Sequence, residues 1–253
     1  MEAALPDLAI GVWVLAGLAF LAGGIVKGVL GVGLPLFTVP VLAGLFEPAT
    51  AIALMVVPIL SSNAWQALQG GLIGEVLRRF WSAMPGLIVL SVIGAQFISK
   101  VEPSAGSLVM GLIVIAFVIY QLRPLGAATP LRAERWLTPL VGVLSGGLGG
   151  VSHFYGPPLI AYLVALRLPK DMFVATVATW FVIGNIPLYG SLALSRVLDL
   201  QVLVASSLAS GPALLGLVIG RRLRRHVSQD TFHKLLLLAL LVVAGNLIRV
   251  GVS

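Results

Sequence analysis

Hydrophobic residues fill long stretches of this chain, and polar residues are confined mainly to the short segments between them. A helix needs about 20 apolar residues to cross the hydrocarbon core of a bilayer. The pattern therefore predicts an all-α polytopic membrane protein. The apolar segments run at about 8–26, 32–46, 49–69, 80–98, 104–122, 136–152, 156–167, 172–194, 200–220 and 232–250.

The second and seventh of these segments are shorter than a full span. We expect each to join the segment before it in a hairpin or a broken helix. Under either arrangement each half of the chain crosses the membrane an odd number of times. The second half is then inserted upside down relative to the first.

A glycine pattern occurs twice, 118 positions apart. Without a gap, Gly24, Gly28 and Gly31 pair with Gly142, Gly146 and Gly149, and a proline and two further apolar residues also match downstream. Glycine interruptions at matched places in two apolar halves are typical of inverted-repeat transporters. The sequence predicts one membrane domain over 1–253, with repeats at about 8–122 and 136–252 and a connector at 123–135.

Composition agrees with a membrane domain. Hydrophobic residues make up 59% of the chain and charged residues 10%, and the mean hydropathy is +1.08. Soluble domains carry roughly a quarter charged residues. The first residues include the acids Glu2 and Asp7, whereas a signal peptide begins with basic residues, so we expect the first span to be retained.

The basic residues indicate the orientation. With the N-terminus outside, twelve loop cations fall on the cytoplasmic side and three outside, and loop Lys and Arg collect on the cytoplasmic side of membranes. We expect both termini to be extracytoplasmic. The net charge of +7 then marks topology and does not indicate nucleic-acid binding. The inner set is Arg78, Arg79, Arg123, Arg132, Arg135, Arg167, Lys170, Arg221, Arg222, Arg224, Arg225 and Lys234; the outer set is Lys100, Arg196 and Arg249.

Lys27 lies inside the first glycine pattern, away from any clear loop. An intramembrane cation is costly and indicates a functional site. The alternative is that Lys27 ends the first span and extends to the headgroups. Backbone broken at membrane depth must be buried in protein or line a wet cavity. We therefore list Gly28, Gly31, Gly33, Gly149 and Gly150 with Lys27 as candidate substrate-binding residues.

Three polar residues, Ser152, His153 and Tyr155, follow the second glycine run and precede two prolines. Freed amides and a new helix N-terminus at such a turn favour an anion. We include these residues in the candidate site, the alternative being that His153 is structural. His153 also titrates near neutral pH, which would couple transport to protons.

Asn63 and Asn185 lie in the middle of matching segments, with Gln66 near the first. We expect them to face one central site from opposite repeats. The alternative is that they hold helices together by hydrogen bonds between them.

Acidic residues fall only in loops or at segment ends. A cation carrier normally needs an intramembrane carboxylate, whereas an anion carrier does not. The chain has no cysteine, which excludes disulfides and thiolate metal sites. No nucleophile and base pair, metal cluster or dinucleotide motif is evident, so we expect no enzyme activity, no cofactor and no metal.

The paired glycine pattern, with Val39 and Pro40 after the first copy and Gly156–Leu163 after the second, resembles the sulfite exporter family, TauE/SafE. The end of the ninth segment at Gly220–Leu223 adds to the resemblance, which covers essentially the whole chain. The chain departs from the usual pattern at Leu34–Pro35 and Ser152–Phe154. The resemblance implies a bacterial inner-membrane carrier, built from two repeats, for anions such as sulfite, thiosulfate, organosulfonates or carboxylates.

We therefore expect a secondary transporter, most simply an exporter, that works by alternating access. Its partners are a small anion and the lipid bilayer; homo-oligomers are left open. A passive anion channel and a membrane assembly factor are the alternatives.

Overall fold

The computed structural model describes residues 10–46, 48–97, 112, 114–115, 118–119, 131–152, 155–194 and 200–252. This part of the chain is helical and contains no strand, which confirms the all-α class. The helices are α1 (Ile10–Leu30), α2 (Leu34–Ala43), α3 (Pro48–Ala53), α4 (Val56–Leu68), η1 (Gln69–Gly71), α5 (Ile73–Phe80), η2 (Trp81–Ala83), α6 (Met84–Phe97), α8 (Leu131–Ser152), α9 (Gly156–Ala165), α10 (Lys170–Leu194), α11 (Leu200–Arg224) and α12 (Gln229–Val252).

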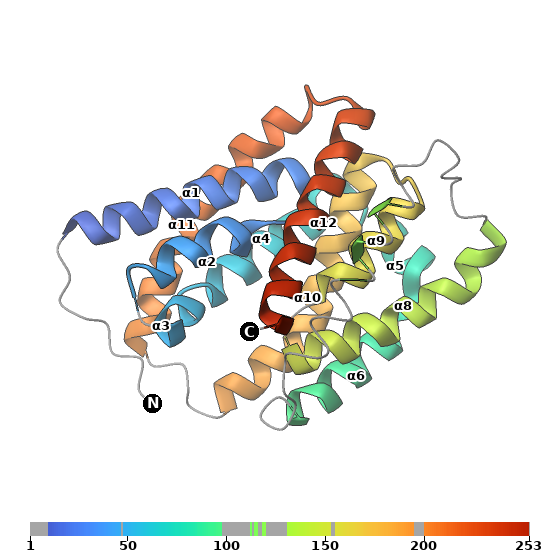
Figure 1. Cartoon of the computed structure of the whole chain (residues 1–253), viewed down its shortest axis with the longest axis horizontal. Helices are drawn as coiled ribbons and strands as arrows, with labels where there is room; N and C mark the ends of the chain where they lie inside the picture. Colours follow the sequence, from blue (N-terminus) through green and yellow to red (C-terminus); the bar gives the residue numbers. More distant parts are fainter. Residues whose placement is uncertain are drawn as a thin grey trace.

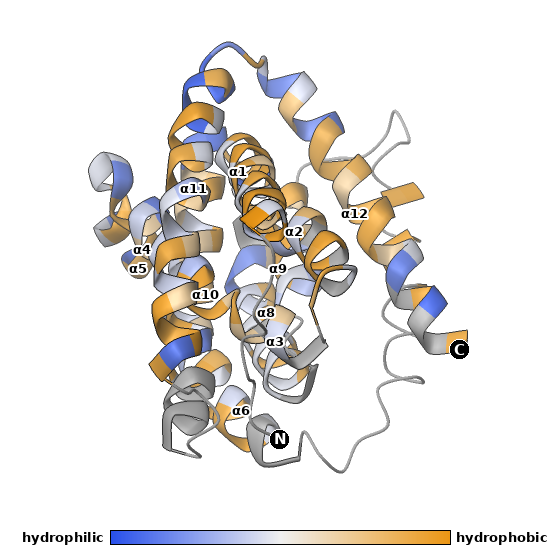
Figure 2. Cartoon of the chain, turned by 90° about the vertical axis from the view of Figure 1, so that its left-hand side faces the viewer, coloured by the Kyte–Doolittle hydropathy of each residue, from blue (hydrophilic) through white to orange (hydrophobic). Residues whose placement is uncertain are grey.

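Among these residues, three stretches are long and apolar enough to cross a membrane: Ile10–Leu30, Ile73–Gly94 and Leu200–Arg224. The expected segment at 104–122 lies mostly outside the described residues. Figure 2 shows that the helix bodies are mainly hydrophobic, while hydrophilic residues gather where α11 ends and α12 begins. The protein is therefore a membrane protein.

α2 and α9 have ten residues each. At 1.5 Å per residue such a helix is about 15 Å long, half the hydrocarbon thickness. Each has proline within its first turn, where the missing N–H needs no intrahelical partner. α2 follows α1 and α9 follows α8 along the chain. Each is too short to cross a bilayer on its own.

The expected segment at 49–69 is divided into α3 and α4 by a turn at Leu54 and Met55. Pro58 has no N–H to donate to the Leu54 carbonyl four residues before it. The hydroxyl of Ser206 on α11 donates to that carbonyl at 2.9 Å and accepts from the Val57 amide at 3.0 Å. One serine on a neighbouring helix thus satisfies both backbone groups at this break.

Two pairs of helices pack closely, α1 against α11 and α6 against α8 (Figure 1). A methyl group on Gly24 would overlap the Ala213 carbonyl, and one on Gly28 would overlap that of Leu217, so α1 and α11 run in parallel. Glycines spaced by four allow this approach. Gly216 and Gly220 form the α11 side of the contact, against Leu21, Ile25 and Gly28 of α1.

The second pair is built in the same way. Gly142 lies against Ala83, and Gly150 lies against Ser91 and Gly94, so α6 and α8 are also parallel. α10 packs against both α4 and α6, between the two pairs. Its Trp180 is fully buried and meets Phe80 edge to face, with 6.3 Å between ring centroids.

The turn before α10 is bonded to the turn after α11. The Lys170 ammonium donates to the carbonyls of Arg224 at 2.9 Å and Val227 at 2.6 Å. The Gln229 side chain accepts from the Lys170 amide and donates to the Leu168 carbonyl. These bonds join the two turns at the hydrophilic end of the molecule.

Candidate functional site

Lys27 lies in the last turn of α1, and only 3% of its surface is exposed. Its ammonium donates a 2.5 Å hydrogen bond to the side-chain oxygen of Asn63 on α4. The side chain therefore points into the protein, and the alternative that it extends to the headgroups is wrong. Asn63 is also buried, so the two polar groups meet away from solvent.

α1 ends at Leu30, three residues after Lys27, and residues 31–33 connect it to α2. Gly31 and Gly33 have φ of 81° and 108°, left-handed values that favour glycine. The Gly31 amide donates to the Lys27 carbonyl at 2.7 Å and is not free for a ligand. Gln66 donates its side-chain amide to the same carbonyl at 3.0 Å. The structure thus brings together four of the expected residues, Lys27, Gly31, Asn63 and Gln66.

Gly28, another candidate residue, lies in a helix contact. It faces Gly220 and Leu217 across the α1–α11 contact, so it sets the helix separation beside Lys27.

The second glycine run does not break its helix. Gly149 and Gly150 lie within α8, which continues to Ser152, so the expected interruption at these glycines is wrong. Gly150 lies against Ser91 and Gly94, and Gly149 lies against the ring of Tyr155. Their missing side chains make room for neighbours and do not free backbone amides. Ser152 is the last residue of α8; its side chain and all of His153 lie outside the described residues.

Tyr155 lies beside the part of α10 that carries Asn185. The Tyr155 hydroxyl donates to the Gly184 carbonyl at 2.8 Å. Asn185 donates to the Phe181 carbonyl of its own helix at 2.7 Å. The hydrogen bond of Asn185 therefore stays within α10, whereas that of Asn63 joins α4 to α1.

A cavity of about 220 Å³ lies beside Gln66, and the sequence pattern does not predict that its lining residues come together. Its polar lining residues are Gln66, Gln69, Lys170, Asp171, Arg221, Arg224 and Arg225. In the sequence, the basic residues that line this cavity are explained by membrane topology alone, as cytoplasmic loop charges. One signal was present: Gly216, Gly220 and Arg224 are spaced by four, which places Arg224 on the packed face of α11.

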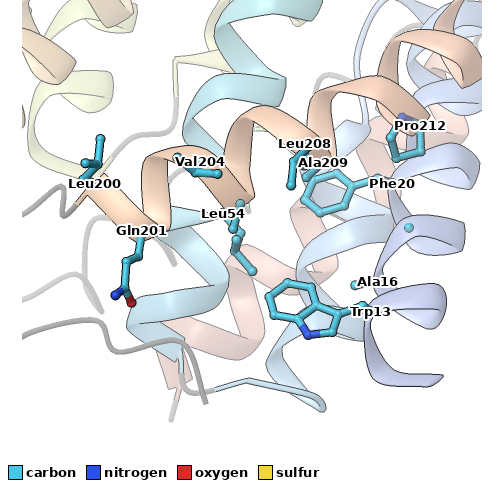
Figure 3. A pocket seen from close by; sticks show the side chains of 12 residues that line it. Trp13, Ala16, Phe20, Leu54, Leu200, Gln201, Val204, Leu208, Ala209 and Pro212 are labelled. Carbon is cyan, nitrogen blue, oxygen red and sulfur yellow. The ribbon is translucent and has the colours of Figure 1, made fainter. Parts of the chain in front are cut away.

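A larger cavity, about 700 Å³, lies between α1 and α11 (Figure 3). Trp13, Phe20, Leu208 and other apolar side chains line it, with Gln201 at one end. Such a lining offers few donors to an anion, so we place the candidate site at Lys27.

The Lys27 ammonium has no carboxylate partner among the described residues; its hydrogen bond goes to the neutral Asn63, whereas Arg79 pairs with Glu134 and Arg224 with Asp171. The described residues also contain no group of three His, Cys, Asp or Glu side chains able to hold a metal. A buried cation beside neutral amides is suited to binding an anion.

Neither curated proteins nor solved structures give a match to this chain. A family model described as "Sulfite exporter TauE/SafE" matches residues 15–247, nearly the whole chain. That family consists of transporters, which agrees with the expectation that the chain is not an enzyme. Together with its apolar helices, this match shows that the chain is a membrane transport protein of the sulfite exporter TauE/SafE family.

Proposed function

We propose that this protein exports small sulfur-containing or carboxylate anions across the inner membrane and binds them at Lys27, Asn63 and Gln66. The observation that carries the proposal is the burial of the Lys27 ammonium with a neutral partner. Removing a cation from water is costly unless an opposite charge compensates it. A substrate anion supplies that charge during each transport cycle.

The selectivity of this site follows from its donors. The Lys27 ammonium has three N–H groups, and one is used by Asn63. The remaining donors suit the oxygens of a sulfite, sulfonate or carboxylate group. A cation would be repelled, because the described part of the site holds no carboxylate.

Alternating access is supported by the arrangement of the helices. α1 packs in parallel against α11, and α8 packs in parallel against α6. The short helix α2 follows α1, and the short helix α9 follows α8. α1 and α8 run in opposite directions in Figure 1. We propose two inverted repeats at about 8–122 and 136–252 that rock against each other.

Purified protein reconstituted alone in liposomes tests the function. We expect it to move sulfite, thiosulfate or sulfoacetate and to accumulate one of them against its gradient when a coupling gradient is imposed. Flux that only dissipates the anion gradient would instead identify a channel. Absence of flux for all these anions and for small carboxylates would overturn the transport proposal.

Substitution of Lys27 tests the site separately from the function. We expect Lys27→Gln to abolish flux while the protein remains folded, because the charge that attracts the anion is lost. Lys234→Gln, on the exposed face of α12, is the matched control and should transport normally. Full flux in Lys27→Gln would show that the anion binds elsewhere.

A further inference from the structure

We infer that the cavity lined by Gln66, Gln69, Lys170, Arg221, Arg224 and Arg225 is a second anion site, at which an oxyanion binds before it reaches Lys27. The inference rests on the proposed anion transport for its place on the pathway. Binding of an oxyanion to the cavity itself does not depend on that pathway.

The first argument is charge. Four cationic side chains line the cavity with a single carboxylate, that of Asp171. Asp171 pairs with one nitrogen of Arg224, Nη2, at 3.1 Å, and its side chain is 69% exposed. The Lys170 ammonium is bonded to two neutral carbonyls. The cavity therefore keeps an excess of positive charge that its own acid does not compensate.

The second argument is the unpartnered donors. Arg224 is 4% exposed, and its other terminal nitrogen, Nη1, has no hydrogen-bond partner. The side-chain nitrogen of Gln69, Nε2, is also buried and unpartnered. Buried donors are nearly always satisfied in folded proteins. Two of them from different helices, η1 and α11, line one cavity, and the acceptor oxygens of an anion would satisfy both.

Gln66 connects this cavity to Lys27. It is 2% exposed and lines the cavity, and its side-chain nitrogen donates to the Lys27 carbonyl. Its side-chain oxygen, Oε1, is buried without a partner and would accept a hydrogen bond from a water or a protonated oxygen of a bound anion. Val174 also lines the cavity and packs on Gly31 at the break. The second site is therefore adjacent to the end of α1 that carries Lys27.

The size of the cavity limits its occupant. Its volume of about 220 Å³ is below the range of about 300–1,000 Å³ for pockets that enclose drug-sized ligands. A free sulfite or sulfate ion fits with water, and so does the phosphate of a lipid headgroup. The shared chemistry is an oxyanion group, and the two sources are separated by experiment.

Calorimetric binding of sulfite to the purified full chain, in neutral detergent without anionic lipid, tests the site. We expect Gln69→Leu to weaken binding by about tenfold, because a buried donor to the anion is lost. Arg224→Gln should weaken it further. Arg222→Gln removes the same charge from the exposed side of α11 outside the cavity, so it is the matched control. If Arg224→Gln fails to fold, the binding of sulfite to Gln69→Leu tests the site on its own.

Two further comparisons separate the outcomes. Lys27→Gln should keep binding in this cavity while losing flux, so binding without flux supports the second site even if the proposed function fails. If sulfite does not bind but phosphatidylglycerol in nanodiscs binds, with the same sensitivity to Gln69→Leu and Arg224→Gln, the site holds a lipid headgroup. If neither ligand is affected by these two variants, the inference is overturned.

Discussion

Gly28 of α1 and Gly220 of α11 face each other so closely that a Cβ atom built on either would lie 2.8 Å from the Cα atom of the other. Gly24 and Gly216 extend the contact one turn earlier on each helix. The contact fixes the position of the α1 end that carries Lys27. We therefore expect the position of Lys27, and with it transport, to depend on these two glycines.

We predict that Gly28→Ala destabilises the protein, because the new methyl group would overlap the Leu217 carbonyl. Overpacking of this kind costs about 1–3 kcal/mol. The thermal unfolding midpoint in detergent should fall. Gly17→Ala and Gly211→Ala are matched controls on the same two helices, where a methyl group meets nothing within 4 Å. A midpoint for Gly28→Ala equal to those of the controls would contradict the prediction.

The glycines show how far the sequence was informative. Their matched spacing predicted two related segments in the two halves of the chain. It did not predict the role of each glycine, because a residue without a side chain permits either a left-handed turn or a close helix contact. Gly31 has a positive φ, whereas Gly149, its partner in the register, is helical and packs on Tyr155. Which role applies depends on tertiary neighbours, and the sequence alone does not reveal them.

Asn63→Asp should weaken transport by about tenfold or more, because a carboxylate beside Lys27 would form a buried ion pair and compete with the anion. Protein stability should be unchanged or higher. Flux and thermal unfolding measure the two effects. Asn246→Asp is the control, since Asn246 also accepts from a cation, Arg249, but at an exposed position. Normal flux in Asn63→Asp would show that the anion does not use the Lys27 charge.

The burial of Lys27 and Arg224 marks another limit of the sequence. The sequence predicted a first span that ends near residue 26, with Lys27 at the membrane boundary. In the structure α1 continues to Leu30, and Lys27 donates to Asn63 on α4. Arg224 belongs to a basic run that correctly suggested a hydrophilic helix end, and its spacing from Gly220 places it on the packed face of α11, but the sequence does not reveal its ion pair with Asp171 of α10. In both cases the partner lies on a distant segment of the chain.

Gly31→Ala should destabilise the protein more than Gly71→Ala. Both positions have positive φ, 81° and 69°, so each substitution carries backbone strain of about 1–2 kcal/mol. Only at Gly31 does the new methyl group also overlap a neighbour, Val174. Thermal unfolding compares the two variants. Adding Val174→Ala to Gly31→Ala should recover part of the loss; equal losses in both single variants would exclude a role for the Val174 contact.

Single cysteines in this cysteine-free chain test the orientation. We expect an impermeant maleimide to label Ile10→Cys and Val252→Cys in intact spheroplasts, because both positions are highly exposed and near the termini. Arg222→Cys should be labelled only after permeabilisation, because loop cations favour the cytoplasm. Labelling of Arg222→Cys in intact spheroplasts would contradict the predicted orientation.

The bonds from Lys170 to the carbonyls of Arg224 and Val227 have a mechanical consequence. They fasten the start of α10 to the end of α11, and the glycine contact fastens α11 to α1. Because α1 belongs to the first proposed repeat and α10 and α11 belong to the second, we expect a displacement of α10 at this end to be passed through α11 to α1, which couples the motions of the two repeats. The residues with positive φ, which are Gly31 and Gly33 after α1, Gly70 and Gly71 after α4 and Arg167 before α10, are points at which the backbone can pivot beside these helices.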